Sequence, residues 1–146
     1  MKKMMGLATI VLFCFFGVAG AEMVDNGDGT VTDTATGLMW QQSTGNDGDV
    51  LTWEDALDYS ENLSLAGHDD WRLPDRNELQ SLVDYDRYDP AIDTVAFPGT
   101  QSSGYWSSTS NALSTVLAWR VNFDSGGVYG YGKPNSYYVR AVRGGQ

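Results

Sequence analysis

The chain reads Asp-Asp-Trp-Arg-Leu-Pro-Asp-Arg-Asn-Glu-Leu-Gln-Ser-Leu-Val over residues 69–83, and this stretch carries the strongest local signals for the fold. Proline is well tolerated in the first turn of a helix, and acidic residues there complement the helix dipole, so Pro74, Asp75 and Glu78 indicate a helix start. Apolar residues follow at helical spacing, at Leu79, Leu82 and Val83. The stretch therefore predicts a short helix with one buried face.

The polar and aromatic residues just before this helix, Asp69 to Arg72, allow two interpretations. In the first, Asp69 and Asp70 bind a cation and Trp71 stacks against a sugar. In the second, Trp71 lies in the core between two helices, and Arg72 pairs with a buried carboxylate or with carbonyl groups. We favour the second interpretation, in which the cluster holds the fold together.

Upstream, the sequence predicts two short strands and a first helix. Asn-Gly and Asp-Gly dipeptides within residues 25–29 tolerate positive φ and predict a hairpin turn into a strand around residues 30–32. A second turn at Thr36-Gly37 leads to a short strand over residues 38–41. Thr52 is a suitable N-cap for a helix that begins at Trp53, whose apolar residues recur every three or four positions.

Downstream, residues 84–103 contain Pro90, Pro98 and Gly99, which interrupt any periodic pattern, so we expect a long loop region. Its expected local anchors are Tyr85, Tyr88 and Phe97. Strands are then expected over residues 105–109, 116–124, 128–131 and 137–142. This order of elements predicts an α+β domain with a largely antiparallel sheet, two helices and a long loop region.

Residues 1–21 have the layout of a secretory signal peptide: a basic start, an uncharged apolar run and small residues at the end. The run is shorter than the roughly 20 apolar residues that a membrane span needs. We expect cleavage to leave one domain, residues 22–146, in the periplasm or outside the cell and not inserted in a membrane. Cleavage also removes the single cysteine, Cys14, which excludes disulfides and cysteine chemistry from the mature chain.

The expected mature chain is strongly acidic, with seven basic residues against 19 acidic ones and a net charge of −12. It has no basic stripe or lysine-arginine cluster, which argues against nucleic acid and anionic lipid as partners. The charge is compatible with calcium, cationic groups or neutral polymers such as glycans.

Calcium is the one cofactor that the sequence leaves open. Residues 25–33 do not match the EF-hand loop, because glycines occupy the third and fifth positions where oxygen ligands are needed. On the long loop, Asp84, Asp86 and Asp89 are weak candidates for a calcium site, since calcium prefers several oxygen ligands on a flexible loop. We otherwise expect no metal and no cofactor.

Tyrosines on glycine-flanked segments provide the candidate ligand surface. Residues 128–138 place rings beside amide and hydroxyl groups, a combination used by recognition loops. The candidate ligand residues are Tyr129, Tyr131, Lys133 and Asn135. The alternative, in which Tyr129 and Tyr131 face the core, stays equally open.

Four segments in order resemble the Lcl C-terminal domain family, named for the C-terminal part of a Legionella collagen-like adhesin. They are residues 28–33 with 36–40, residues 70–74 with 78–79, residues 105–108 and residues 139–144. The resemblance implies a C-type-lectin-like fold, in which the N- and C-terminal strands pair, two helices flank the sheet and a long loop region carries ligands. The expected scaffold residues are Trp40, Asp70, Trp71, Arg72, Trp106, Trp119, Arg140 and Arg143.

The resemblance also implies a surface module, since adhesin relatives bind sulfated glycans. At −12, this chain lacks the basic surface that a sulfated polymer requires. We therefore expect an exported, non-catalytic recognition or adhesion module that binds a glycan or protein ligand at the cell surface. Two alternatives remain: an envelope enzyme that acts on carbohydrates through a carboxylate pair, and a structural subunit of a homo-oligomer.

Overall fold

The computed structural model describes residues 22–145. They form a domain of nine strands, two α-helices and one 3-10 helix (Asn46–Gly48). The strands are β1 (Met23–Asp25), β2 (Thr30–Asp33), β3 (Met39–Gln41), β4 (Leu51–Thr52), β5 (Gly104–Asn111), β6 (Ser114–Asn122), β7 (Gly127–Gly132), β8 (Ser136–Tyr137) and β9 (Val142–Arg143). The helices are α1 (Trp53–Glu61) and α2 (Arg76–Gln80). The predicted signal peptide, with Cys14, lies outside the described residues.

A four-stranded antiparallel sheet, in the order β1-β2-β3-β9, joins the beginning of the described chain to its end. Its register places Trp40 opposite both Val31 and Val142. The turn between β1 and β2 contains Gly27 and Gly29, both with φ in the left-handed region that glycine adopts without strain. The hairpin predicted for residues 25–33 and the strand predicted for residues 38–41 are thus confirmed.

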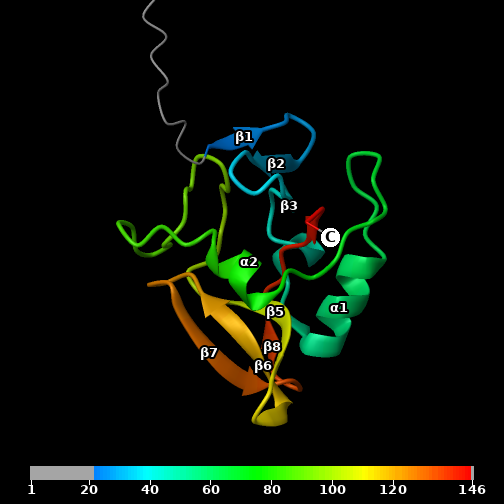
Figure 1. The fold of residues 1–146 in the computed structure, drawn as a ribbon, viewed down its shortest axis with the longest axis vertical. Coiled ribbons are helices and arrows are strands. Elements are labelled where there is room, and N and C mark those ends of the chain that lie inside the picture. The colour runs from blue at the N-terminus through cyan, green and yellow to red at the C-terminus, as the bar shows by residue number, and fades with distance from the viewer. Residues whose placement is uncertain (1–21, 146) are drawn as a thin grey trace, which may run out of the picture.

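A three-stranded antiparallel sheet, β5-β6-β7, lies at the other end of the molecule, while β4 and β8 form a separate pair (Figure 1). The single closing strand predicted for residues 137–142 is wrong: the segment contributes β8 to one sheet and β9 to another. The physical reason lies between them, where Val139, Arg140 and Ala141 turn into the core and are fully buried. Their backbone groups form hydrogen bonds with loop residues as well as with strand residues. For example, Val139 O accepts a hydrogen bond from Gly45 N.

Both predicted helices are present, and α1 has the expected N-cap. Thr52 Oγ1 accepts a hydrogen bond from Asp55 N at the start of α1. Asp75 caps α2 in a reciprocal capping box with Glu78. The helix predicted within residues 73–83 is shorter than expected, because Pro74 precedes the cap and the chain turns after Gln80. No helix among residues 22–145 is long and apolar enough to cross a membrane.

Two apolar clusters form the core. The larger contains Trp40, Tyr105, Val121 and Phe123, and the smaller contains Trp106 and Ala118. Because neighbouring residues of a strand point to opposite faces, Tyr105 and Trp106 of β5 contribute to different clusters. The sheet β5-β6-β7 therefore separates the two clusters and supports side chains on both faces.

The long loop over residues 84–103 is confirmed as irregular structure. Its anchors differ from the expected ones: Phe97 is buried, but Tyr85 and Tyr88 are 67% and 81% exposed. Ile92 is fully buried in their place. The described residues thus form a mixed α and β domain whose sheets are mostly antiparallel, with two helices and one long loop region.

Candidate functional site

A cavity of about 500 Å³ opens between the start of α2 and the hairpin that joins β5 to β6. We call it the Arg76–Trp119 cavity. Its lining residues are Asp75, Arg76, Asn77, Thr109, Ser110, Asn111, Ala112, Leu113 and Trp119. Aromatic, aliphatic, hydroxyl, amide and guanidinium groups therefore meet in one hollow, as is common in binding sites.

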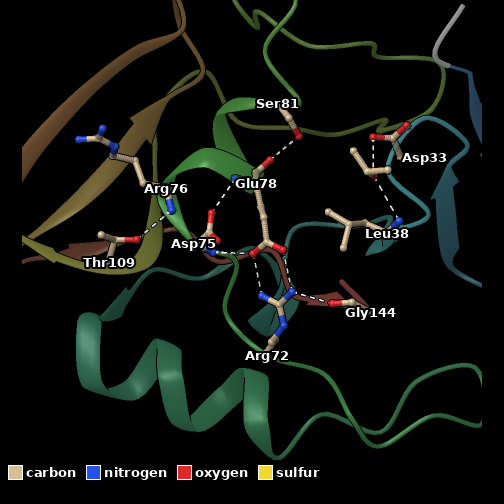
Figure 2. Close-up of polar contacts among 10 residues, drawn as sticks. Asp33, Leu38, Arg72, Asp75, Arg76, Glu78, Ser81, Thr109 and Gly144 are labelled. Atoms are coloured by element: carbon tan, nitrogen blue, oxygen red, sulfur yellow. Dashed lines mark hydrogen bonds and ion pairs between the residues drawn. The ribbon is translucent and has the colours of Figure 1, made fainter. Parts of the chain in front are cut away.

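Arg76 is held in this cavity by both its backbone and its side chain. Its backbone N–H donates to Thr109 Oγ1 at 3.0 Å, which ties the first residue of α2 to β5 (Figure 2). Its guanidinium carbon lies 4.7 Å from the centre of the Trp119 ring, a favourable cation–π distance. In residues 22–145, no carboxylate forms an ion pair with Arg76, so the charge is available to a ligand.

One apolar side chain of the cavity lining is exposed to solvent. Leu113, at the tip of the β5–β6 hairpin, is 99% exposed. Asn111 Oδ1 accepts from Leu113 N at 2.9 Å and shapes the turn. The hairpin thus presents an aliphatic group to the cavity that contains Arg76.

The distribution of charge favours ligand binding at this end of the molecule. All acidic residues except Asp124 precede residue 94, so the sheet β5-β6-β7 is almost free of carboxylates. Asp75 lines the cavity, but one of its carboxylate oxygens accepts from Glu78 N at 2.8 Å in the helix cap. The strands of this sheet therefore add no carboxylate that would repel an anion at the cavity.

The tyrosine surface predicted from the sequence lies around the other face of the same sheet. Tyr131 is half-buried, with its ring 3.7 Å from the Arg120 guanidinium carbon, while Tyr129 is 51% exposed. Lys133 Nζ lies 4.0 Å from the centre of the Trp53 ring, and Asn135 is exposed. The role of Tyr129, Tyr131, Lys133 and Asn135 in binding stays a prediction, with Tyr131 also part of the packing.

Arg72 holds the scaffold together, in the way the second interpretation of its cluster predicts. Its two terminal nitrogens donate to the two carboxylate oxygens of Glu78, each at 2.7 Å, and Nη2 also donates to Gly144 O (Figure 2). Burial disfavours the charged form of Glu78, but hydrogen bonds from Arg72 and from the Asp75 backbone outweigh it, so its pKa is lowered. Trp71 is buried, and its indole N–H donates to the carbonyl groups of Leu65 and His68.

Asp70, like Arg72, forms an ion pair, and its partner lies in a segment that is distant in the sequence. Its carboxylate accepts from Arg143 Nε at 2.7 Å and from Arg143 Nη2 at 3.1 Å. These hydrogen bonds lower the pKa of Asp70. The pair connects the segment before α2 to β9.

Arg140 is a fully buried cation with neutral partners. It donates to the carbonyl groups of Gln41 and Gln42 and to Thr100 Oγ1, and its guanidinium carbon lies 4.6 Å from the centre of the Phe97 ring. Burial lowers its pKa to about 10. Arg140 thereby joins the C-terminal segment to β3 and to the long loop.

The remaining predicted scaffold residues are tryptophans. Trp40 and Trp106 are fully buried, and Trp106 Nε1 donates to Leu51 O at 2.9 Å. Trp119 is only half-buried, and it lines the cavity beneath Arg76. It therefore contributes to a candidate binding site as well as to the sheet.

The weak calcium candidates are not brought together. No group of three or more histidine, cysteine or acidic residues within the described part of the chain could hold a metal ion. Asp84 instead pairs with Arg87, at 3.0 Å between Oδ2 and Nε, and Oδ1 accepts from Asp86 N. Asp86 and Asp89 line a shallow hollow of about 320 Å³ beside the exposed ring of Tyr88.

Sequence reasoning missed Arg76 and Leu113 as candidate binding residues. Arg76 was considered only as part of a helix start, and its position over Trp119 depends on contacts between distant segments. Leu113 offered one signal, because it is a lone leucine among the polar residues that connect two expected strands. A leucine in a short polar connection between strands is expected at the surface, where it can contact a ligand.

Comparison with known proteins shows the family of the chain. A family model described as the Lcl C-terminal domain matches residues 29–143. No curated protein matches the chain. The matched range includes the four-stranded sheet from β2 onward, both helices, the long loop and the Arg76–Trp119 cavity.

Proposed function

The chain belongs to the Lcl C-terminal domain family, and on that premise we propose that it is an exported, non-catalytic recognition or adhesion module. It binds a glycan or protein ligand at the cell surface. Binding takes place at the end formed by β5, β6 and β7. The scaffold residues around Arg72, Asp70 and Arg140 fix the fold, and exposed groups at this end select the ligand.

We further propose that the fold is C-type-lectin-like. Three features support this proposal: β9 pairs antiparallel with β3, two helices accompany the sheets, and a long irregular region covers residues 84–103. The pairing brings the C-terminal segment back to the N-terminal hairpin. Because β9 pairs with β3, the domain is closed by these strands and not by the long loop region.

The observation that carries the proposal is the coincidence of three properties at one end of an acidic protein. The Arg76–Trp119 cavity is there, an almost fully exposed leucine, Leu113, is there, and acidic residues are missing from the strands β5 and β6 that contribute to it. Exposed apolar groups next to a cavity are typical of interaction sites.

A non-catalytic role is favoured over a glycosidase role by the carboxylates of the cavity. Hydrolysis of a glycosidic bond uses two carboxyl groups on either side of the bond. Within the described residues, Asp75 is the single carboxylate that lines this cavity, and it is engaged in the cap of α2. The cavity is thus better suited to binding than to turnover.

The test is a binding screen of the exported protein against a glycan array and, by cross-linking, against cell-surface proteins. Leu113→Ser removes the exposed leucine, and Val95→Ser is a matched control, because Val95 is 83% exposed on the long loop. We expect a ligand whose binding is weakened by Leu113→Ser and unchanged by Val95→Ser. If no ligand is found, or if light scattering shows that the protein binds only itself, the proposal is wrong.

A further inference from the structure

We propose that the Arg76–Trp119 cavity captures the C-terminal carboxylate of a protein partner whose last residue is apolar. This inference rests on the proposed recognition function and names the class of ligand for it. The argument uses the state of the Arg76 guanidinium, the side chains around it and the charge of the surrounding surface.

Arg76 differs from the other arginines of the described chain in being open to a ligand. Three arginines form ion pairs, at Arg72, Arg87 and Arg143. Arg140 donates to carbonyl groups in the core, and the Arg120 guanidinium lies between two rings, 3.7 Å from that of Tyr131 and 4.1 Å from that of Tyr137. Arg76 contacts one ring only.

Trp119 prepares the guanidinium for a planar anion. An arginine that stacks on an aromatic ring keeps its N–H donors in the plane of the guanidinium, where they can form two parallel bonds to a carboxylate. In Figure 2 the Arg76 side chain points away from the Arg72–Glu78 pair, so its donors are not drawn into that network. The ordering of the side chain is then complete before the ligand arrives, which lowers the entropic cost of binding.

The same stacking argues against a sugar as the ligand. A sugar ring commonly rests on a free aromatic face, but the Trp119 face in this cavity is covered by Arg76 at 4.7 Å. The exposed apolar group among the lining residues is aliphatic, at Leu113. It matches an apolar side chain next to the carboxylate better than it matches a ring of hydroxyl groups.

The amide side chains suit a peptide backbone. Asn77 from α2 and Asn111 from β5 both line the cavity with the Arg76 guanidinium. An amide side chain offers both a donor and an acceptor, as a peptide group does. A volume of about 500 Å³ is within the usual range for small ligand sites and accommodates the end of a chain.

Charge restricts the ligand to a single carboxylate. With a net charge of −12 on the expected mature chain, a polyanion is repelled by most of the surface. One carboxylate that enters this end meets Arg76 and few acidic groups. A free chain terminus next to an apolar residue has this single, local charge.

The experiment uses the exported protein labelled with ¹⁵N and two acetylated tetrapeptides that end in leucine, one with a free carboxylate and one with a terminal amide. We expect the free acid to shift the backbone resonances of Asn77, Thr109 and Leu113 and the indole resonance of Trp119. We expect the amide to bind at least about tenfold more weakly, since it lacks the charge-assisted hydrogen bonds. A free acid that ends in serine tests the apolar contact and should also bind more weakly.

Arg76→Gln and Arg87→Gln form a matched pair of variants. Arg76→Gln should remove the preference for the acid over the amide, whereas Arg87→Gln, which is paired with Asp84 on the long loop, should keep it. Thermal melts verify that both variants fold. Arg76→Lys, which keeps the charge without the planar fork, should recover only part of the preference.

The inference is overturned if the acid and the amide bind equally, if Arg76→Gln keeps the preference, or if no peptide shifts the cavity resonances. It is also overturned if glucose or glucuronate shifts them and the peptides do not, because the ligand is then a sugar. The broader recognition function fails separately, when the glycan array and the cross-linking screen both yield no ligand.

Discussion

The Glu78 carboxylate binds the Arg72 guanidinium through two hydrogen bonds of 2.7 Å, and both side chains are mostly shielded from solvent. Glu78 Oε1 also accepts from Asp75 N at 2.9 Å, and Arg72 Nη2 donates to Gly144 O at 2.7 Å. One ion pair therefore joins the segment before α2, the helix itself and the C-terminal segment. These are the elements that position Arg76 at the cavity.

Arg72→Ala should destabilise the protein by about 2–4 kcal/mol, because it leaves a shielded carboxylate and a carbonyl group without their partner. Urea unfolding of the protein at neutral pH measures the loss. The double variant with Glu78→Ala should lose less than the sum of the two single variants. A change of less than about 0.5 kcal/mol for Arg72→Ala, as expected at an ordinary surface position, contradicts the structural role.

Stability should fall in acid partly through Glu78. Its pKa in the folded protein lies below its ordinary value of 4.5, because the Arg72 and Asp75 hydrogen bonds outweigh the effect of burial. The folded state then binds fewer protons than the unfolded state, so the contribution is complete above pH 4.5 and is lost as the pH falls through the lowered pKa. Glu78→Gln should flatten this acid limb in urea midpoints measured at several pH values. Arg72→Gln should flatten it as well, and a variant curve that runs parallel to the wild-type curve speaks against the assignment.

Local signals in the sequence were sufficient for most elements. The hairpin at residues 25–33 follows from glycines that adopt positive φ, and the starts of α1 and α2 follow from the caps Thr52 and Asp75. Such features depend on a few neighbouring residues. The closing strand did not follow, because the burial of Arg140 depends on acceptors from Gln41, Gln42 and Thr100, which lie 40 to 99 positions away.

The candidate site was harder to predict for the same reason. Alternation along the strand from residue 114 to 122 identified Trp119 as a strand residue, but only the packing of α2 on the sheet brings Arg76 over its ring. The sequence also left open whether Tyr129 and Tyr131 face the core. The structure places Tyr131 half-buried against Arg120 and leaves Tyr129 exposed, so the two tyrosines differ.

Thr100→Val should cost about 1–3 kcal/mol, because it removes the acceptor of a fully buried Arg140 N–H and the donor to Phe97 O, and leaves both groups without this partner. Valine has nearly the same shape as threonine, so the loss reports these two hydrogen bonds. Thr94→Val is the control, since Thr94 is exposed on the same loop and its replacement should stay within about 0.5 kcal/mol. Equal urea midpoints for the two variants disprove the role of Thr100.

Tyr131→Ala should destabilise the protein by about 2 kcal/mol, through lost packing and a lost cation–π contact with Arg120, whereas Tyr129→Ala should be near neutral. Thermal melts separate the two variants. Any loss of ligand binding in Tyr129→Ala is then an effect on recognition and not on folding. Equal melting temperatures for both variants show that Tyr131 has no packing role.

Calcium should leave the melting temperature unchanged. Asp84 is paired with Arg87, and the acidic residues of the long loop do not converge in the described structure, so a cation finds few ligands there. A bound ion at 100 times its dissociation constant adds about 2.7 kcal/mol, which raises the melting temperature of a domain of this size by several degrees. Melts in about 5 mM calcium and in chelator detect even the weak sites of extracellular modules. A rise that disappears in Asp86→Asn and persists in Asp28→Asn places a calcium site on the long loop, against this expectation.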